Sequence, residues 1–148
     1  MTTIVYKDGV LAADSLVTDR GCRMGSAKKI ISSRFGLAGA VGHLGLMQAF
    51  LNWAATGRPA DGRPVPDKTD DNDFEGLIIT PAGQVLWYGG DMVAVDMTQS
   101  EYVCLGSGFR VAMGALEMGA TAEQAVRVAA KVDTSTGGPI HVLELKTD

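Results

Sequence analysis

The sequence predicts an α+β fold in which two antiparallel β-sheets have helices on their outer faces. Three observations support this fold class. Short β-prone runs come in pairs with turn signals between them, as in hairpins. The order of elements is strands, a helix, strands, two helices and a strand, with no βαβ alternation. The length of 148 residues, 46% of them hydrophobic and 20% charged, is that of one globular domain over residues 1–148.

The first two strands are expected at residues 3–6 and 10–13. An Asp-Gly pair separates them, and this dipeptide between apolar runs is a strong hairpin signal. Residues 15–27 have mixed polarity and include glycines, so we expect a loop or a ragged strand there. A second hairpin follows, with arms at residues 29–32 and 36–41.

The middle of the chain predicts a helix and then a loop. Apolar residues recur at helical spacing until Gly57, which with the following Pro59 is a typical stop signal. Residues 58–73 are polar, proline-spaced and without periodicity, which predicts a loop within the domain. The apolar face of the helix consists of Leu46, Met47, Phe50, Leu51 and Ala54.

More strands follow this loop. Residues 77–80 and 84–88 predict a strand, a turn and a strand. Residues 92–97 and 101–105 are expected to extend the same sheet.

The last third of the chain predicts two helices and a strand. The first helix is expected over about residues 109–118, and the second begins with a capping box at Thr121. Residues 133–138 have turn composition, and residues 140–145 alternate apolar and polar, as a half-buried strand does.

Charge and hydropathy exclude two classes of partner. The net charge of −4 and the pI near 5.1 lack the basic footprint of a nucleic-acid binder. Residues 35–57 are free of charge and as long as a membrane span, but they are rich in glycine and contain polar residues. We therefore expect no nucleic acid and no membrane as partners.

The residue types also exclude most metal and cofactor chemistry. Cys22 and Cys104 are too few for a disulfide scaffold and lack zinc-ligand spacing, and the only histidines are His43 and His141. The Gly-Ser-Gly at residues 106–108 lacks the third glycine of a dinucleotide fingerprint. We expect no metal and no cofactor. The two cysteines fit a reducing cytoplasm best, and charge appears too early in the chain for a signal peptide, so we expect no export.

Several segments, taken in order, resemble one known family over nearly the whole chain. They are residues 2–5, 7–15, 28–30, 37–42, 105–108 and 133–138, which read TTIV, KDGVLAADS, KKI, LAGAVG, LGSG and DTSTGG. Together they resemble the proteasome β subunit and the bacterial HslV family. The resemblance implies an N-terminal-nucleophile (Ntn) hydrolase with a four-layer αββα sandwich. The chain would be a shortened member of that family.

The resemblance also implies a mechanism. In that family a threonine exposed by processing attacks an amide through its hydroxyl, and its own α-amino group is the base. Thr2 is the corresponding residue once Met1 is removed, and a residue as small as threonine permits that removal. An α-amino group has a pKa of about 7.7–8.0, so it is partly neutral near pH 7.

The resemblance assigns roles to two charged residues. Lys29 matches the lysine beside the nucleophile, whose ammonium lowers the pKa of the amine. Asp14 matches the carboxylate that holds this lysine. The alternative interpretation is that the two residues form an ordinary surface pair.

Five further residues receive roles from the same resemblance. Ser107, Asp133 and Thr136 match the polar network near the amino group, although these residue types also favour turns and caps. The backbone N–H of Gly39 matches the oxyanion-hole donor, with a simple packing glycine as the alternative. Thr18 matches a substrate-binding position on a strand that pairs with extended peptides.

The chain departs from the family pattern in two places. Its first strand is shorter, and at about 3.3 Å per residue a loss of about three residues moves the end of that strand about 10 Å from its usual position. Thr2 is therefore expected to fall short of Lys29. The long second helix of the family is replaced by the loop at residues 58–73.

The leading hypothesis is a threonine peptidase that hydrolyses peptides or unfolded proteins in a homo-oligomeric ring, with an ATP-dependent unfoldase as a partner that the resemblance allows. Two alternatives remain. One is a catalytically silent, self-assembling structural protein, which the short first strand and a retained Met1 would both favour. The other is a small-molecule Ntn amidohydrolase, because this fold accommodates many amide substrates.

Overall fold

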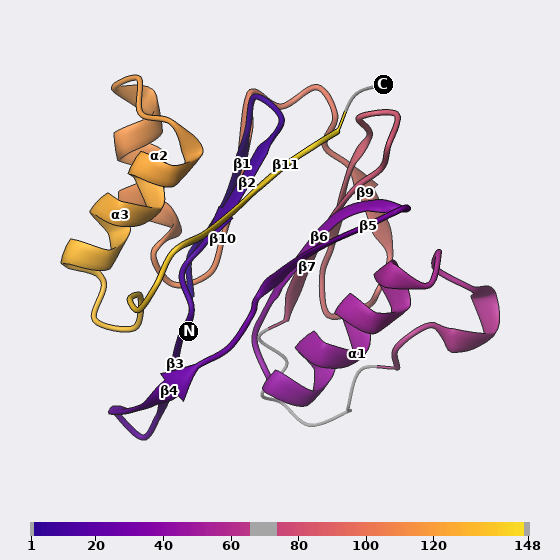
Figure 1. Cartoon of the computed structure of the whole chain (residues 1–148), viewed down its shortest axis with the longest axis horizontal. Helices are drawn as coiled ribbons and strands as arrows, with labels where there is room; N and C mark the ends of the chain where they lie inside the picture. The colour runs from indigo at the N-terminus through magenta and orange to yellow at the C-terminus, as the bar shows by residue number, and fades with distance from the viewer. Residues whose placement is uncertain (1, 66–73, 147–148) are drawn as a thin grey trace.

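The computed structural model describes residues 2–65 and 74–146 and stacks them in four layers (Figure 1). Two β-sheets face each other, and helices cover the outer face of each sheet. The predicted α+β class and its αββα arrangement are confirmed. Every strand pair among the described residues is antiparallel.

The first sheet has the strand order β10-β1-β2-β11. Its central hairpin is the predicted one, because Asp8 and Gly9 adopt positive φ angles of 52° and 77° in the turn between β1 and β2. The predicted final strand is also present, although its alternation differs from the expected one at two residues, because polar His141 is half-buried and apolar Val142 is exposed. The strands are β1 (Ile4–Lys7), β2 (Val10–Ala13), β10 (Tyr102–Leu105) and β11 (His141–Glu144).

The second sheet has the order β5-β6-β7-β8-β9. Its strands are β5 (Ile30–Ser33), β6 (Gly36–Val41), β7 (Glu75–Ile79), β8 (Val85–Tyr88) and β9 (Ala94–Asp96). The prediction that residues 101–105 extend this sheet is wrong, because β10 pairs with β1 in the first sheet. A turn after β9 carries the chain across the sandwich, and local sequence does not encode that change of partner.

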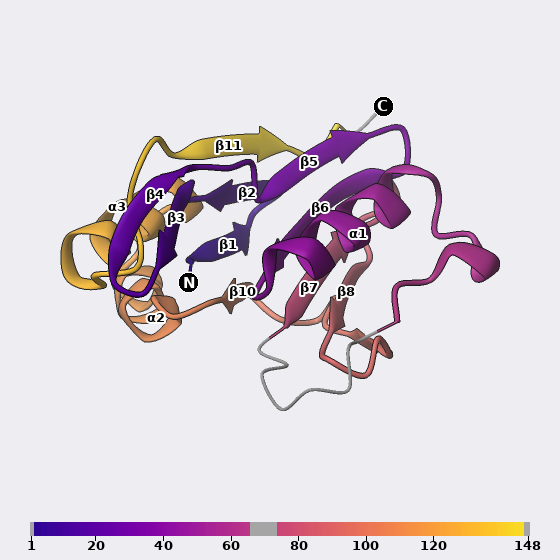
Figure 2. The same cartoon turned by 90° about the horizontal axis from the view of Figure 1, so that it is seen from below.

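A separate hairpin occupies the segment expected to be a loop or a ragged strand. Strands β3 (Leu16–Asp19) and β4 (Cys22–Ser26) pair with a register shift between Val17 and Thr18, which explains the irregular pattern of polarity. Strand β4 is exposed along its length. Both views place this hairpin beside the N-terminus, beyond the ends of the two sheets (Figures 1 and 2).

Three α-helices form the outer layers of the described chain. Helix α1 (Leu44–Ala55) covers the second sheet, and α2 (Phe109–Glu117) and α3 (Ala122–Val132) cover the first (Figure 2). The predicted capping box opens α3, with the Thr121 hydroxyl accepting from the Gln124 N–H at 3.1 Å. Among the described residues, no helix has the length and apolar character needed to cross a membrane.

The predicted loop at residues 58–73 lies only partly within the described chain. It contains a short 3₁₀ helix, η1 (Ala60–Gly62), and residues 66–73 lie outside the described ranges. The Trp53 indole at the end of α1 donates to the Pro59 carbonyl at 2.9 Å, which ties the start of the loop to the helix.

Strand β1 lies at the centre of the first sheet and is buried on both faces. Ile4 packs into the core between the two sheets, whereas Val5 packs against α2 and α3. Thr2 and Thr3 precede these residues and continue the alternation, with exposed fractions of 2% and 0%. The fold therefore places the N-terminal segment inside the sandwich. The core between the sheets consists of Ile4, Leu11, Ala13, Ile30, Leu37, Val41, Leu77, Ile79, Val85, Val103 and Leu105.

Candidate active site

The Thr2 hydroxyl lies between two buried charged groups. The Lys29 ammonium donates to Thr2 Oγ1, and Thr2 Oγ1 donates to Asp14 Oδ1. Lys29 Nζ and Asp14 Oδ1 are 2.9 Å apart, with side chains 3% and 0% exposed. The interpretation of Asp14 and Lys29 as a surface pair is therefore wrong.

The expectation that Thr2 falls short of Lys29 is also wrong, because the two side chains are in direct hydrogen-bond contact. The Asp14 N–H donates to the Thr3 carbonyl at 3.2 Å, so the β1–β2 ladder continues to the open end of the hairpin. A hairpin that is shorter at its turn loses residues from both strands together. Its open end stays in place, and Thr2 remains opposite Asp14 and within reach of Lys29.

Lys29 lies immediately before β5 and is held by three acceptors. Its ammonium donates to Leu16 O at 2.7 Å as well as to Thr2 Oγ1 and Asp14 Oδ1. Burial lowers the pKa of Lys29, although the nearby Asp14 carboxylate acts in the opposite direction. The lysine is thus a hydrogen-bond donor whose proton is held less tightly than in water.

Asp14 is fully buried and is satisfied by backbone as well as side-chain donors. Oδ1 accepts from the Thr3 N–H at 3.1 Å, and Oδ2 accepts from the Gly137 N–H at 3.0 Å. A buried carboxylate needs both a counter-charge and donors for its remaining lone pairs. Asp14 has both, so it fixes Lys29 and the N-terminal segment at once.

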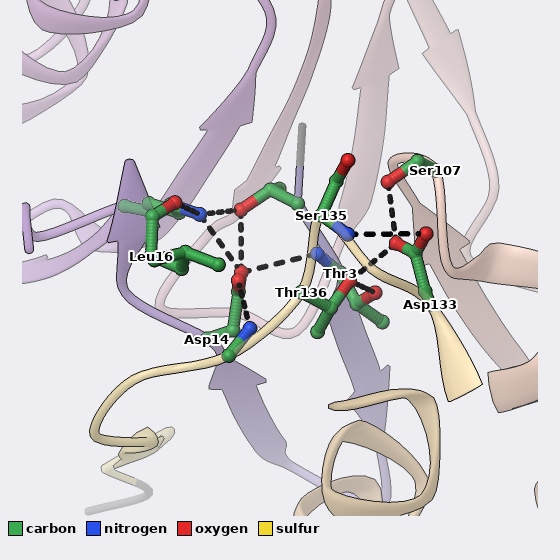
Figure 3. A network of polar contacts seen from close by, with 10 residues as sticks. Thr3, Asp14, Leu16, Ser107, Asp133, Ser135 and Thr136 are labelled. Atoms are coloured by element: carbon green, nitrogen blue, oxygen red, sulfur yellow. Dashed lines mark hydrogen bonds and ion pairs between the residues drawn. The ribbon is translucent and has the colours of Figure 1, made fainter. Parts of the chain in front are cut away.

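Ser107, Asp133 and Thr136 form a second polar group, which Figure 3 shows beside Thr3. Ser107 Oγ and Thr136 Oγ1 each donate to Asp133 Oδ2 at 2.6 Å. Partial burial raises the pKa of Asp133, but these two hydrogen bonds, the Ser135 N–H and the charge of the N-terminus together outweigh burial and lower the pKa overall. The three residues predicted to cooperate are thus in direct contact.

Thr3 joins the two groups and was missed by the sequence analysis. Its hydroxyl lies 2.8 Å from Thr136 Oγ1, while its N–H donates to Asp14. Strand alternation explains the arrangement, because Thr2 shares the face of Ile4 and Thr3 shares the face of Val5. That alternation was readable from the sequence, and it would have placed Thr3 on the α3 side.

The loop at residues 106–108 covers the N-terminal segment. A side chain on Gly106 would place Cβ 1.9 Å from Thr2 O, and one on Gly108 would place Cβ 2.0 Å from Thr3 Oγ1. The Gly108 N–H also donates to Thr2 O at 3.4 Å. These glycines are required by close contact with the backbone of Thr2 and the side chain of Thr3.

Gly106→Ala should displace Thr2 and destabilise the fold. Gly106 has φ +94°, which costs a substituted residue about 1–2 kcal/mol, and the contact with Thr2 O adds to this. We expect the free energy of unfolding to fall by about 3 kcal/mol in urea titrations. Gly83→Ala is the matched control, because Gly83 has φ +91° with no atom within 4 Å of the added Cβ. Equal losses in the two variants would contradict the steric role of Gly106.

A small cavity of about 50 Å³ lies beside Thr2. Thr18, the predicted substrate-binding residue, lines it from β3. Gly39 is not among the described lining residues: it lies within β6 between Ile30 and Leu77, and a Cβ there would be 3.0 Å from the Ile30 side chain. Its placement fits the alternative of a packing glycine. The cavity is lined by Thr2, Leu16, Val17, Thr18, Lys29, Gly42, Leu44 and Met47.

Two observations on the described part of the chain concern the Cys104 thiol and groups of metal-ligating side chains. Burial raises the pKa of the Cys104 thiol to about 12, so this side chain is not a thiolate at neutral pH. Residues 2–65 and 74–146 contain no group of three or more His, Cys, Asp or Glu side chains arranged to hold a metal ion.

Solved structures share this architecture from end to end. Thiobacillus denitrificans BPH matches with a TM-score of 0.68 and 21% identity, covering 99% of both chains. The same protein in complex with epoxomicin matches at 0.67 and 20%, over 98% of both. Eukaryotic HslV from Trypanosoma brucei matches at 0.63 and 20%, over 97% of this chain and 98% of that one. The chain has an HslV-like fold.

This likeness is one of structure. No protein-family model matches the sequence, and no curated protein sequence matches it either. The HslV-like fold agrees with the four-layer αββα arrangement expected from the ordered segments.

Proposed function

We propose that this chain is a threonine peptidase whose nucleophile is the Thr2 hydroxyl, exposed by removal of Met1. The observation that supports it best is the contact of Thr2 Oγ1 with both Lys29 and Asp14 in a buried site beside a cavity. A threonine hydroxyl at the start of a central strand has no packing reason to be joined to an ammonium and a carboxylate.

In the proposed reaction Thr2 Oγ1 attacks the carbonyl carbon of a peptide bond. The hydroxyl proton passes to the free α-amino group of Thr2 and from there to the leaving nitrogen, as the C–N bond breaks and a threonyl ester forms. Water then hydrolyses the ester and restores the hydroxyl. Lys29, with its lowered pKa, donates a hydrogen bond to the oxygen as negative charge develops on it.

The proposed substrate is an extended peptide, from a peptide or an unfolded protein. Beyond Leu16, whose N–H donates to Gly137 O, strand β3 pairs only with β4 among the described residues. One edge of β3 is thus available at Val17 and Thr18, next to the cavity beside Thr2. An extended peptide can add to such an edge through its main chain.

We also propose that the chain works as a homo-oligomeric ring, with an ATP-dependent unfoldase as the supplier of unfolded substrate. The ring is inferred from the likeness to HslV. Exposed apolar side chains at the ends of α2 and α3 support it, since Met118, the residue after α2, is 89% exposed and Val132 is 63% exposed.

Intact mass after treatment with epoxomicin tests the proposal. We expect a chain that has lost Met1 and gained one covalent adduct, mapped by peptide sequencing to Thr2. Epoxomicin is the probe because a structural neighbour has been solved in complex with it. An adduct on Cys22 instead, which is an exposed free thiol, would argue against the N-terminal nucleophile.

The labelling experiment, combined with the assembly state of the chain and a panel of peptide and acyl-amide substrates, separates the alternatives. An unmodified chain that retains Met1 and forms a stable ring would favour the catalytically silent assembly protein. A labelled chain that cleaves small acyl amides but no peptide would favour the small-molecule amidohydrolase.

A further inference from the structure

Thr3 is completely buried and uses both its backbone and its side chain in polar contacts. Its N–H donates to Asp14 Oδ1 at 3.1 Å, and its carbonyl accepts from the Asp14 N–H at 3.2 Å. Its hydroxyl lies 2.8 Å from Thr136 Oγ1. Among the described residues, Thr3 is therefore in contact with both polar groups of the candidate site.

The direction of the hydroxyl hydrogen bond follows from counting protons. Thr136 Oγ1 has one proton, and it donates that proton to Asp133 Oδ2 at 2.6 Å. Thr3 Oγ1 must then be the donor to Thr136 Oγ1. Two hydroxyls in series thus end on one carboxylate, and each bond in such a chain polarises and strengthens the next.

The space around the Thr3 hydroxyl is closed. A Cβ on Gly108 would lie 2.0 Å from Thr3 Oγ1 and 3.2 Å from Thr136 Oγ1, so only a glycine leaves room for both oxygens. The Gly108 N–H donates to Thr2 O at 3.4 Å. The contact that fixes the side chain of Thr3 is thus made by the same residue that holds the backbone of Thr2.

We propose that Thr3 is a positioning residue for Thr2, acting through its hydrogen bond to Thr136. This inference rests on the proposed function. Asp14 fixes the backbone of Thr3 on the side of Lys29, and the Thr3–Thr136–Asp133 chain fixes its side chain on the side of α3. The peptide unit between Thr2 and Thr3 is therefore held from both faces of the sheet, which sets where Thr2 Oγ1 can lie.

Three variants test this role. Thr3→Val removes the hydroxyl and keeps the shape, and Thr3→Ser restores the hydroxyl. Thr80→Val is the matched control, because Thr80 is also buried and its hydroxyl accepts from the Gln84 N–H at 3.0 Å in a turn of the second sheet. Peptide turnover, thermal melting and amide hydrogen exchange at Gly108 are measured for each variant.

We expect Thr3→Val to lower kcat by about 10- to 100-fold with KM unchanged, because small misplacements of a reacting group have effects of this size. The kcat of Thr3→Ser should lie within about threefold of the wild-type value, and Thr80→Val should leave kcat unchanged. Exchange at the Gly108 amide should be about tenfold faster in Thr3→Val only, because that amide reports the position of Thr2 without any need for turnover.

Two results would overturn the inference. One is wild-type kcat and wild-type Gly108 exchange in Thr3→Val, with a loss of melting temperature no different from that of Thr80→Val. The other is a Thr3→Ser variant as impaired as Thr3→Val. A wild-type chain without turnover is a failure of the proposed function instead, and the Gly108 exchange rates then decide alone whether Thr3 positions Thr2.

Discussion

Thr2→Ala should abolish peptide hydrolysis and leave the fold intact. The substitution removes the attacking oxygen, and loss of a nucleophile typically lowers kcat by about 10⁴-fold or more. The buried ion pair remains in this variant, because Lys29 Nζ and Asp14 Oδ1 contact each other directly at 2.9 Å and do not depend on Thr2 as a bridge. We therefore expect the free energy of unfolding to change by about 1 kcal/mol, measured by urea titration beside the turnover assay.

Thr2→Ser is the control for this variant. Serine keeps a hydroxyl at the same position, so measurable turnover and epoxomicin labelling should persist. Alanine and serine are both small enough to permit removal of Met1, so the variants differ from wild type only at the side chain. Wild-type turnover in Thr2→Ala would place the nucleophile elsewhere and end the proposed mechanism.

Local signals predicted most of the fold. The Asp8-Gly9 turn, the capping box at Thr121 and the strand β11 depend on residues close together in the sequence, and each occurs where expected. The partner of β10 depends on long-range packing instead. Val103 and Leu105 face the core between the sheets, as apolar residues of any strand in this sandwich could. Their sequence contains no signal that distinguishes β1 from β9 as neighbour.

The same distinction applies to the site. The segments that resemble the HslV family indicated Asp14, Lys29 and Asp133, and the structure brings each into one of two joined polar groups. The contact of Gly106 with Thr2 was not predictable, because it follows from the pairing of β10 with β1. The position of Gly42 at the cavity was not predictable either, because it depends on β6 ending beside the N-terminal segment, which is far away in the sequence.

The second large effect is expected from Asp14→Asn, chiefly on stability. Removing one partner of a buried ion pair leaves the other charge uncompensated and typically costs about 3–5 kcal/mol. Lys29 would keep Leu16 O and Thr2 Oγ1 as acceptors but lose its counter-charge. Turnover should fall as well, by about 100-fold or more, because Asp14 holds both Lys29 and the Thr3 N–H in place.

Glu123→Gln is the matched control for Asp14→Asn. It makes the same change from carboxylate to amide in an exposed ion pair. Arg127 Nε and Glu123 Oε2 are 3.4 Å apart, and the two side chains are 59% and 43% exposed, respectively. Exposed pairs contribute less than about 1 kcal/mol, so this variant should remain close to wild type in stability and turnover. A loss in Asp14→Asn as small as that of the control would show that burial gives the Asp14–Lys29 pair no special weight.

The stability loss of Asp14→Asn should shrink as the pH rises. Burial lowers the pKa of Lys29 and the Asp14 carboxylate raises it, so removing Asp14 lowers that pKa further. The unfolded chain keeps the ordinary lysine value of about 10.4, so in each protein the unfolded state binds more protons above the native pKa of Lys29, and stability increases with pH there. This increase begins at a lower pH in Asp14→Asn than in wild type, so the difference between the two proteins narrows between their two native Lys29 pKa values. Urea titrations at about pH 7 and about pH 9.5 should therefore show a smaller difference from wild type at the higher pH. An equal difference at both would mean that the loss does not arise from the unpaired Lys29 ammonium.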